Sequence, residues 1–216
     1  MSESGAITGT RRARAAETEV ALKEAAKRVF GRVGYLRAKI TDITAEAGRA
    51  AGSFYSHFDS KEELLEALLV DMLEEGDRSA EQADHNPDFS DLEAVRWHIA
   101  QLWGLLTRDG AVIVALQQAA IVNEHFARRQ QELMAPMFED MAAHLDYVTA
   151  AGGRLPGDRM AVATAMIVLM SQYAFAWQAD WQQGSGARPT ADEAVDMLAA
   201  FIMNGIMGPP RTDKSG

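Results

Sequence analysis

The chain has 216 residues, enough for one large or two modest domains with a buried core. It has no cysteine, which excludes a disulfide framework, a thiol nucleophile and a thiolate metal site. No run of 18 or more apolar residues occurs, and no apolar segment follows the basic N-terminus. We therefore expect no membrane span, no secretory signal and a cytoplasmic location.

The net charge of −10 is unevenly distributed along the chain. Residues 1–61 hold 11 Lys/Arg and 7 Asp/Glu, a net charge of +4, whereas residues 62–216 hold 10 and 24, a net charge of −14. A surface that binds DNA phosphates must carry positive charge, as the first segment does, and the negative charge of the remainder favours solubility. A charge of +4 over this length is also compatible with ordinary scatter.

The N-terminal residues predict an arm followed by a helix. Residues 1–16 are expected to be a disordered basic arm, which either reaches DNA or is a solvated tail. From Glu17 to Val33 the apolar residues recur on one face of a helix, and Gly34 ends it. This helix would pack on the elements that follow and hold them.

The stretch from Thr41 to Lys61 organises the rest of the chain. Thr41 is suited to cap a short helix, and Gly48 is suited to end it in a left-handed conformation. A second short helix is predicted from Ala50 to Phe58, with Phe54 and Phe58 in the core. Two short helices joined by a tight glycine turn are the helix-turn-helix pattern, whose second helix enters the DNA major groove.

These residues resemble the N-terminal signature of the TetR family of bacterial transcriptional regulators. The resemblance covers residues 20–69 and rests on Thr41-Asp42-Ile43, Ala47-Gly48, Gly52-Ser53-Phe54-Tyr55, His57-Phe58, Ser60-Lys61-Glu62 and Leu64. It implies a homodimeric, all-helical protein that binds a palindromic operator and releases it when a small effector binds. Ala50 departs from the pattern, because a Ser or Thr usually caps the recognition helix there.

The predicted DNA-binding residues lie on and around the second short helix. They are Thr41, Arg49, Ala50, Ala51, Gly52, Ser53, Tyr55, His57 and Lys61. Arg49 either donates two hydrogen bonds to guanine or contacts phosphate or solvent. The resemblance implies phosphate contacts for Thr41, Tyr55, His57 and Lys61, and the alternative for Tyr55 is core packing with a surface hydroxyl.

Capping and stop signals predict the remaining helices. Ser60, Ser90 and Thr190 each open a capping box, Asn123 caps a further helix that contains Pro136, and glycines follow several of the helices. The expected helices span about 61–76, 90–106, 111–122, 123–151, 158–183 and 190–207, with 77–88 as a linker. We predict an all-α protein of about nine helices. It comprises a helix-turn-helix domain (17–61), a linking helix (61–76) and a C-terminal ligand-binding and dimerisation domain (77–216).

The C-terminal part is rich in aromatic and methionine side chains, which suit an adaptable apolar pocket as well as plain core packing. The candidate effector-binding residues are Trp97, Trp103, Gln117, Phe126, Met137, Phe138, Met141, Met170, Tyr173 and Trp177. Apolar stripes near the C-terminus suggest a two-fold dimer interface formed by Met166, Leu169, Tyr173, Leu198, Phe201 and Ile202.

Nothing in the sequence indicates catalysis. The five histidines appear scattered, and no Walker loop, dinucleotide-binding glycine motif or nucleophile elbow occurs. We therefore expect no enzyme activity, no metal site and no cofactor, with His98 in the core or at a pocket edge. The predicted function is a homodimeric repressor that an apolar small molecule releases from a palindromic operator. A repressor or activator without an effector is the alternative.

Overall fold

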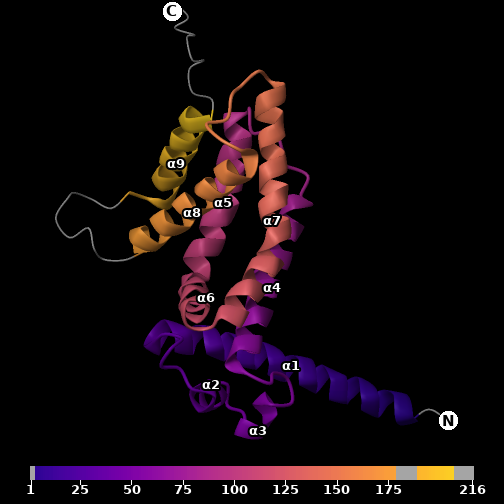
Figure 1. The fold of residues 1–216 in the computed structure, drawn as a ribbon. Coiled ribbons are helices and arrows are strands. Elements are labelled where there is room, and N and C mark those ends of the chain that lie inside the picture. Colours follow the sequence, from indigo (N-terminus) through magenta and orange to yellow (C-terminus); the bar gives the residue numbers. More distant parts are fainter. Residues whose placement is uncertain (1–2, 179–188, 207–216) are drawn as a thin grey trace, which may run out of the picture. The chain divides into compact units, whose positions relative to one another are not determined.

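The structure, a computed structural model, describes residues 3–178 and 189–206. Over these residues the chain forms nine α-helices and no strand, which confirms the all-α prediction (Figure 1). The helices are α1 (Glu3–Val33), α2 (Ile40–Glu46), α3 (Ala51–Phe54), α4 (Lys61–Ala80), α5 (Leu92–Arg108), α6 (Gly110–Val122), α7 (Glu124–Ala150), α8 (Arg159–Gln178) and α9 (Ala191–Ile206). The helix ends predicted at 184–186 and 208–210 lie outside the described residues.

The chain divides into two compact units. The N-terminal unit comprises the chain up to Asp71 together with Asp109–Gln131, and the C-terminal unit comprises Met72–Arg108 and the chain from Glu132 onward. The sequence had placed residues 109–131 in the second domain. In the structure α6 packs against α1, because its apolar face meets the small side chains of that helix: a Cβ on Gly31 would lie 3.5 Å from Ala111 Cβ.

The first helix begins at Glu3, so the prediction of a disordered arm over residues 1–16 is wrong for residues 3–16. Alanine and arginine dominate residues 11–16, and both lower the cost of helix formation. Leu22, Ala25, Ala26 and Val29 are fully buried on one face of α1, as the periodicity predicted. Gly34, at φ +76°, ends the helix.

Polar contacts join the helices of the N-terminal unit. The backbone N–H of Tyr35 donates to Gln118 Oε1 at 3.0 Å, which ties the turn after α1 to α6. Lys27 lies 3.1 Å from the buried carboxylate of Asp109. These contacts hold α1 and α6 together, and α2 and α3 pack on this pair through α1.

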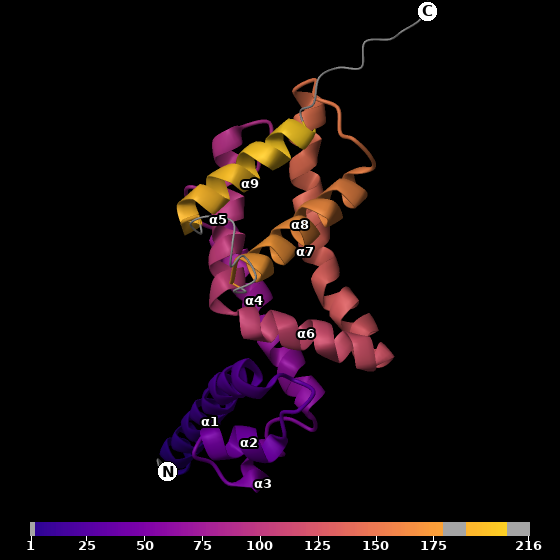
Figure 2. The ribbon, with the colours of Figure 1, turned by 90° about the vertical axis from the view of Figure 1, so that its left-hand side faces the viewer.

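In the C-terminal unit α5 packs against both α8 and α9 (Figure 2). The inward faces of these helices are apolar, and Ile99, Leu198 and Ile202 are each at most 4% exposed. Arg96 of α5 donates to Asp196 of α9 at 2.6 Å at the edge of this contact. The interior is therefore a helix-on-helix core.

Helix caps agree with most of the predicted signals. Asn123, Asp158 and Thr190 accept hydrogen bonds from the first turns of α7, α8 and α9, respectively. Ser90 does not cap α5, because the Asp91 carboxylate accepts the Glu93 N–H and the helix begins one residue later than the predicted capping box implies. Pro136 lies inside α7, as predicted.

Helix α8 is long and apolar enough to cross a membrane by length and composition alone, although the sequence analysis expected no span. The window Arg159–Trp177 has a mean hydropathy of 1.5, and 33% of it is buried. A core helix of a soluble protein meets the same criteria. Single polar residues such as Thr164 and Ser171 interrupt the apolar residues of this helix, so the sequence holds no uninterrupted apolar run that would signal a span.

Candidate nucleic-acid interface and ligand sites

The turn between α2 and α3 requires glycine. Gly48 has φ +63°, a conformation that costs other residues about 1–2 kcal/mol. Its N–H donates to Ala45 O at 3.1 Å, and the N–H of Arg49 donates to Thr44 O at 2.9 Å. This pair of hydrogen bonds is the Schellman ending of a helix, and it redirects the chain into α3.

Thr41 does not cap α2, contrary to the prediction. The helix begins at Ile40, and the N–H of Lys39 donates to Asp42 Oδ2 at 3.0 Å. The Asp42 carboxylate thus satisfies the free end of the helix from within its first turn. Thr41 is left exposed on the surface.

Helix α3 is shorter than predicted, because it ends at Phe54 and residues 55–57 form a turn. Ala50 offers no side chain to cap it, and Gly52 in its only turn lowers its helix propensity. Phe54 and Phe58 are buried and anchor this segment, as predicted. The anchoring leaves a surface of small side chains at positions 50–53, and Ala50, Ala51 and Gly52 are exposed there.

Tyr55 and Arg49 flank this surface. The Tyr55 side chain is 59% exposed, which rules out the alternative that it packs in the core. Arg49 donates from Nη2 to Glu17 Oε1 at 3.1 Å, while its buried Nε has no partner among the described residues. Glu17 is 72% exposed, so the pair is a surface ion pair that an anionic ligand can displace at little cost.

The ammonium of Lys61 is directed inward. It donates to Tyr35 O at 2.7 Å and to Ala38 O at 3.1 Å, and it lies 4.0 Å from the centroid of the Tyr35 ring. Burial lowers the pKa of Lys61, against the opposing effect of the Glu62 carboxylate. A phosphate contact was predicted for Lys61, whereas in the structure its side chain holds the turn after α1.

The predicted effector residues are distributed over both units. Gln117 is exposed and Phe126 is buried, and both belong to the N-terminal unit. Three of the others meet in the C-terminal unit: the ring centroid of Trp103 lies 5.1 Å from that of Trp177 and 6.0 Å from that of Tyr173. Trp103 Nε1 is buried and has no acceptor within the described part of the chain.

The remaining predicted effector residues lie in other places. Met137, Phe138 and Met141 are half-buried on α7, and Met170 is buried on α8. Trp97 Nε1 donates to Asp84 Oδ2 at 3.0 Å, and its ring packs beside His85 and His98 rather than beside Trp103. The C-terminal unit therefore contains two separate aromatic clusters.

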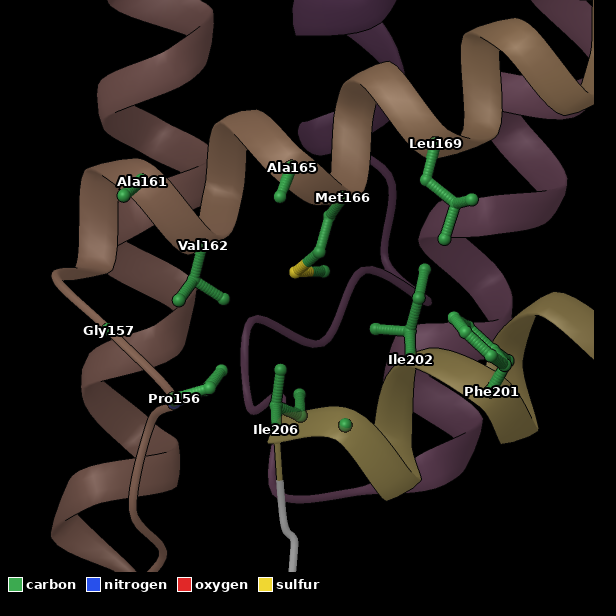
Figure 3. Close-up of a pocket in the computed structure, with 11 residues that line it drawn as sticks. Pro156, Gly157, Ala161, Val162, Ala165, Met166, Leu169, Phe201, Ile202 and Ile206 are labelled. Atoms are coloured by element: carbon green, nitrogen blue, oxygen red, sulfur yellow. The ribbon is translucent and has the colours of Figure 1, made fainter.

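An apolar groove of about 280 Å³ lies between α8 and α9 (Figure 3). Its walls include Val162, Met166 and Leu169 of α8 with Phe201 and Ile202 of α9, and Pro156-Gly157 closes one end. Most of the predicted dimer residues therefore border this groove. They were not predicted to line a cavity.

The predicted dimer residues divide into buried and exposed sets. Met166, Leu198 and Ile202 are at most 5% exposed within the chain, because they face its own core, so they offer little surface to a partner. Phe201 is 64% exposed and Leu169 is 36% exposed. Three further apolar residues of α8 and α9 are exposed but were not predicted from the sequence, namely Val168, Phe175 and Met197.

Three histidines that are far apart in the sequence meet in the C-terminal unit. His85 Nε2 lies 3.1 Å from His98 Nε2 and 3.2 Å from His144 Nε2. The histidines are scattered along the sequence, and no spacing there signals that these three meet in the structure. Burial lowers the pKa of His98 to about 4 and also lowers the pKa of His144, which favours the neutral form of both rings.

The α2–turn–α3 unit, packed on α1, has the helix-turn-helix geometry that is typical of DNA-binding domains. Residues 22–68 match the family model described as "Bacterial regulatory proteins, tetR family". Two curated proteins of Pseudomonas putida, the probable HTH-type transcriptional regulator ArpR and the HTH-type transcriptional regulator TtgR, are each 34% identical over 95 residues. Residues 22–68 therefore resemble the N-terminal domain of TetR-family regulators.

The match spans 44% of this chain and 45% of each curated relative, which is less than half of either length. Solved structures extend the likeness to the whole fold. The transcriptional regulator FadR from Bacillus subtilis, solved in complex with stearoyl-CoA, is 18% identical with a TM-score of 0.72, over 87% of this chain and 98% of that one. The fatty acid degradation regulator FadR from Bacillus halodurans is 17% identical with a TM-score of 0.73, over 88% and 96%.

Proposed function

We propose that the protein is a homodimeric transcriptional regulator that binds a palindromic operator and releases it when a largely apolar small molecule binds. The observation that carries the proposal is the exposed surface of small side chains on α3, next to the turn at Gly48, within a TetR-family domain. Small side chains let a helix approach the groove floor, and an alanine methyl can contact a thymine methyl. Thr41, Ser53, Tyr55 and His57 are the proposed polar contacts to DNA, and Arg49 joins them once Glu17 is displaced.

Dimerisation is supported by apolar residues left on the surface of α8 and α9. On α8 the exposed positions include Ala161, Ala165, Val168 and Phe175, which recur on one helical face. On α9, Met197 and Phe201 are 43% and 64% exposed. Exposed apolar stripes of this kind mark interaction surfaces, and a two-fold operator requires two recognition helices about 34–36 Å apart.

The effector is proposed to bind the C-terminal unit beside Trp103, Tyr173 and Trp177. The aromatic rings provide flat apolar walls, and the indole N–H of Trp103, which has no acceptor among the described residues, offers one donor to an oxygen of the ligand. The stearoyl-CoA in the Bacillus subtilis FadR structure supports a ligand with a long apolar part. The alternative is a regulator without an effector. It is favoured because the described groove lies between α8 and α9 and not beside the Trp103 cluster.

Selection of bound duplexes from a random DNA pool at near-physiological salt tests the proposal. An enriched palindrome, bound by two copies of the chain, is the expected result. The operator then allows ligands to be screened for release, and linkage requires that the operator weaken ligand binding by the same factor. A pool that stays random while binding remains salt-sensitive would contradict sequence-specific regulation.

A further inference from the structure

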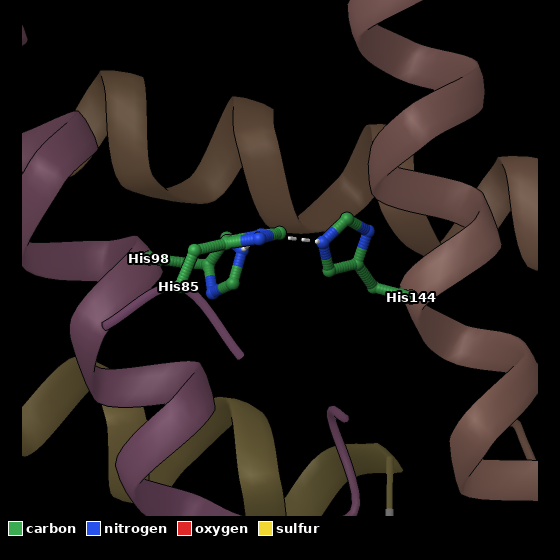
Figure 4. A group of neighbouring side chains, drawn as sticks. All are labelled: His85, His98 and His144. Carbon is green, nitrogen blue, oxygen red and sulfur yellow. Dashed lines mark hydrogen bonds between the residues drawn. The ribbon is translucent and has the colours of Figure 1, made fainter. Parts of the chain in front are cut away.

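We propose that His85, His98 and His144 form a binding site for one divalent transition-metal cation of the Zn²⁺ class (Figure 4). The three residues come from different elements of the C-terminal unit. His85 lies in the segment between α4 and α5, His98 lies on α5, and His144 lies on α7. This site is separate from the proposed DNA contacts and from the Trp103 cluster.

The distances between the three rings suit a metal ion. The Nε2 atoms are 3.1 Å and 3.2 Å apart for the two pairs that include His85, and all three lie within 4.8 Å of one another. Tetrahedral Zn²⁺ with bonds of about 2.0–2.1 Å holds its nitrogen ligands about 3.3–3.4 Å apart. A closing movement between His98 and His144 would place one ion at bonding distance from all three nitrogens.

The other ring nitrogens already have the partners that metal-binding histidines use. His98 Nδ1 lies 2.8 Å from Ala94 O, and His144 Nδ1 lies 2.5 Å from Asp140 O. A carbonyl oxygen only accepts, so each Nδ1 must carry the proton and each Nε2 must present its lone pair. An imidazole fixed in this tautomer by a backbone carbonyl has the second shell typical of a metal ligand.

If all three rings are neutral, the cluster cannot satisfy all three Nε2 atoms without a cation. His85 Nε2 carries at most one proton, so it can donate to His98 or to His144 but not to both. The remaining pair then places two lone pairs about 3 Å apart, which is unfavourable in a half-buried site. A cation that accepts three lone pairs removes this conflict.

The surroundings hold the rings but leave access. Phe89 is buried, and its ring centroid lies 4.8 Å from that of His98 and 5.0 Å from that of His144. Trp97 packs 4.9 Å from His98 on another side. All three histidines are only partly buried, so the fourth coordination position can be taken by water or by a small oxygen ligand. Three protein ligands with one open position define a site able to bind a further molecule, not only to stabilise the fold.

The test uses the full chain without an affinity tag, stripped with EDTA and dialysed. Zn²⁺ is titrated in competition with a chromophoric chelator, and Co²⁺ is added in a parallel experiment as a spectroscopic probe. We expect one ion per chain and the visible absorption bands of Co²⁺ in a tetrahedral site. The variants His85→Gln, His98→Gln and His144→Gln should each weaken Zn²⁺ binding by more than about 100-fold, since loss of a second-shell partner alone costs 10–100-fold.

His125→Gln is the matched control, because His125 is exposed on α7, the helix that also carries His144. It should bind Zn²⁺ as the wild type does. His85 is in a non-helical segment, so His85→Gln should keep the wild-type helix content by circular dichroism and isolate the loss of a ligand from unfolding. Three results would each overturn the proposal: no 1:1 binding at micromolar Zn²⁺, wild-type affinity in the three cluster variants, or an equal loss in His125→Gln.

Discussion

Replacement of Lys61 with methionine separates a structural role of this residue from a role in DNA binding. Methionine keeps the length of the side chain but removes the ammonium that donates to Tyr35 O and Ala38 O. A hydrogen bond to a charged group contributes about 1.5–3 kcal/mol, and a cation–π contact about 0.5–1 kcal/mol. Water can reach this half-buried site and replace part of what is lost, so we expect a net cost of about 2 kcal/mol in the free energy of unfolding.

Urea denaturation followed by circular dichroism measures this cost. Lys39→Met is the control, because Lys39 is an exposed lysine next to α2, and we expect it to change stability by less than about 0.5 kcal/mol. The selected operator then gives the salt dependence of binding for both variants. If Lys61→Met unfolds like the wild type while the slope of log K against log salt falls by about one, the ammonium contacts a phosphate in solution and the structural role is refuted.

Four further predictions concern other positions. Arg49→Ala should change the free energy of unfolding by less than about 1 kcal/mol, because the substitution breaks a surface ion pair. If Arg49 reads a base, the same variant should bind the selected operator more weakly by about 1–3 kcal/mol. A uniform loss of affinity across DNA sequences would instead indicate a phosphate contact. Gly48→Ala should destabilise the chain by about 1–2 kcal/mol through its positive φ alone, since no atom lies within 4 Å of the added Cβ, and an unchanged urea midpoint would contradict this. The backbone N–H and the hydroxyl of Thr190 lower the pKa of Glu193, so Thr190→Ala should raise this pKa towards its ordinary value. The stability that these hydrogen bonds contribute is present above the ordinary pKa of a glutamate and is lost as the pH falls through the lowered pKa of Glu193. An NMR titration of the Glu193 carboxylate measures the change in pKa. Phe201→Glu should abolish dimers in sedimentation experiments while the helix content stays unchanged, and a persistent dimer would place the interface elsewhere.

Local chemistry made much of the fold predictable from the sequence. Asn123, Thr190 and Gly34 act through hydrogen bonds or backbone conformations that involve their immediate neighbours, so their effects can be recognised from short motifs. The helix-turn-helix was identified for the same reason. Where two neighbouring side chains competed to cap a helix, as Thr41 and Asp42 do at α2, the sequence did not show which would be used.

The parts that the sequence did not reveal depend on contacts between distant residues. Nothing in the spacing of His85, His98 and His144 indicates that their rings meet, because helix packing brings them together. The ammonium of Lys61 was assigned to DNA because its position at a helix start suggested a phosphate, whereas its acceptors lie more than 20 residues earlier. Which apolar residues of α9 face α5 and which face solvent was likewise decided by packing.

The brevity of α3 limits how much sequence information one copy of the chain can extract from DNA. A single helical turn that presents Ala51, Gly52 and Ser53, with Ala50 just before it, offers few hydrogen-bond donors to base edges, so each half-site would be read with low information content. If the proposed function holds, discrimination among genomic sites must come from the fixed spacing of two such readings and from the deformability of the intervening base pairs. The operator should then tolerate substitutions within a half-site better than the insertion of one base pair between the half-sites.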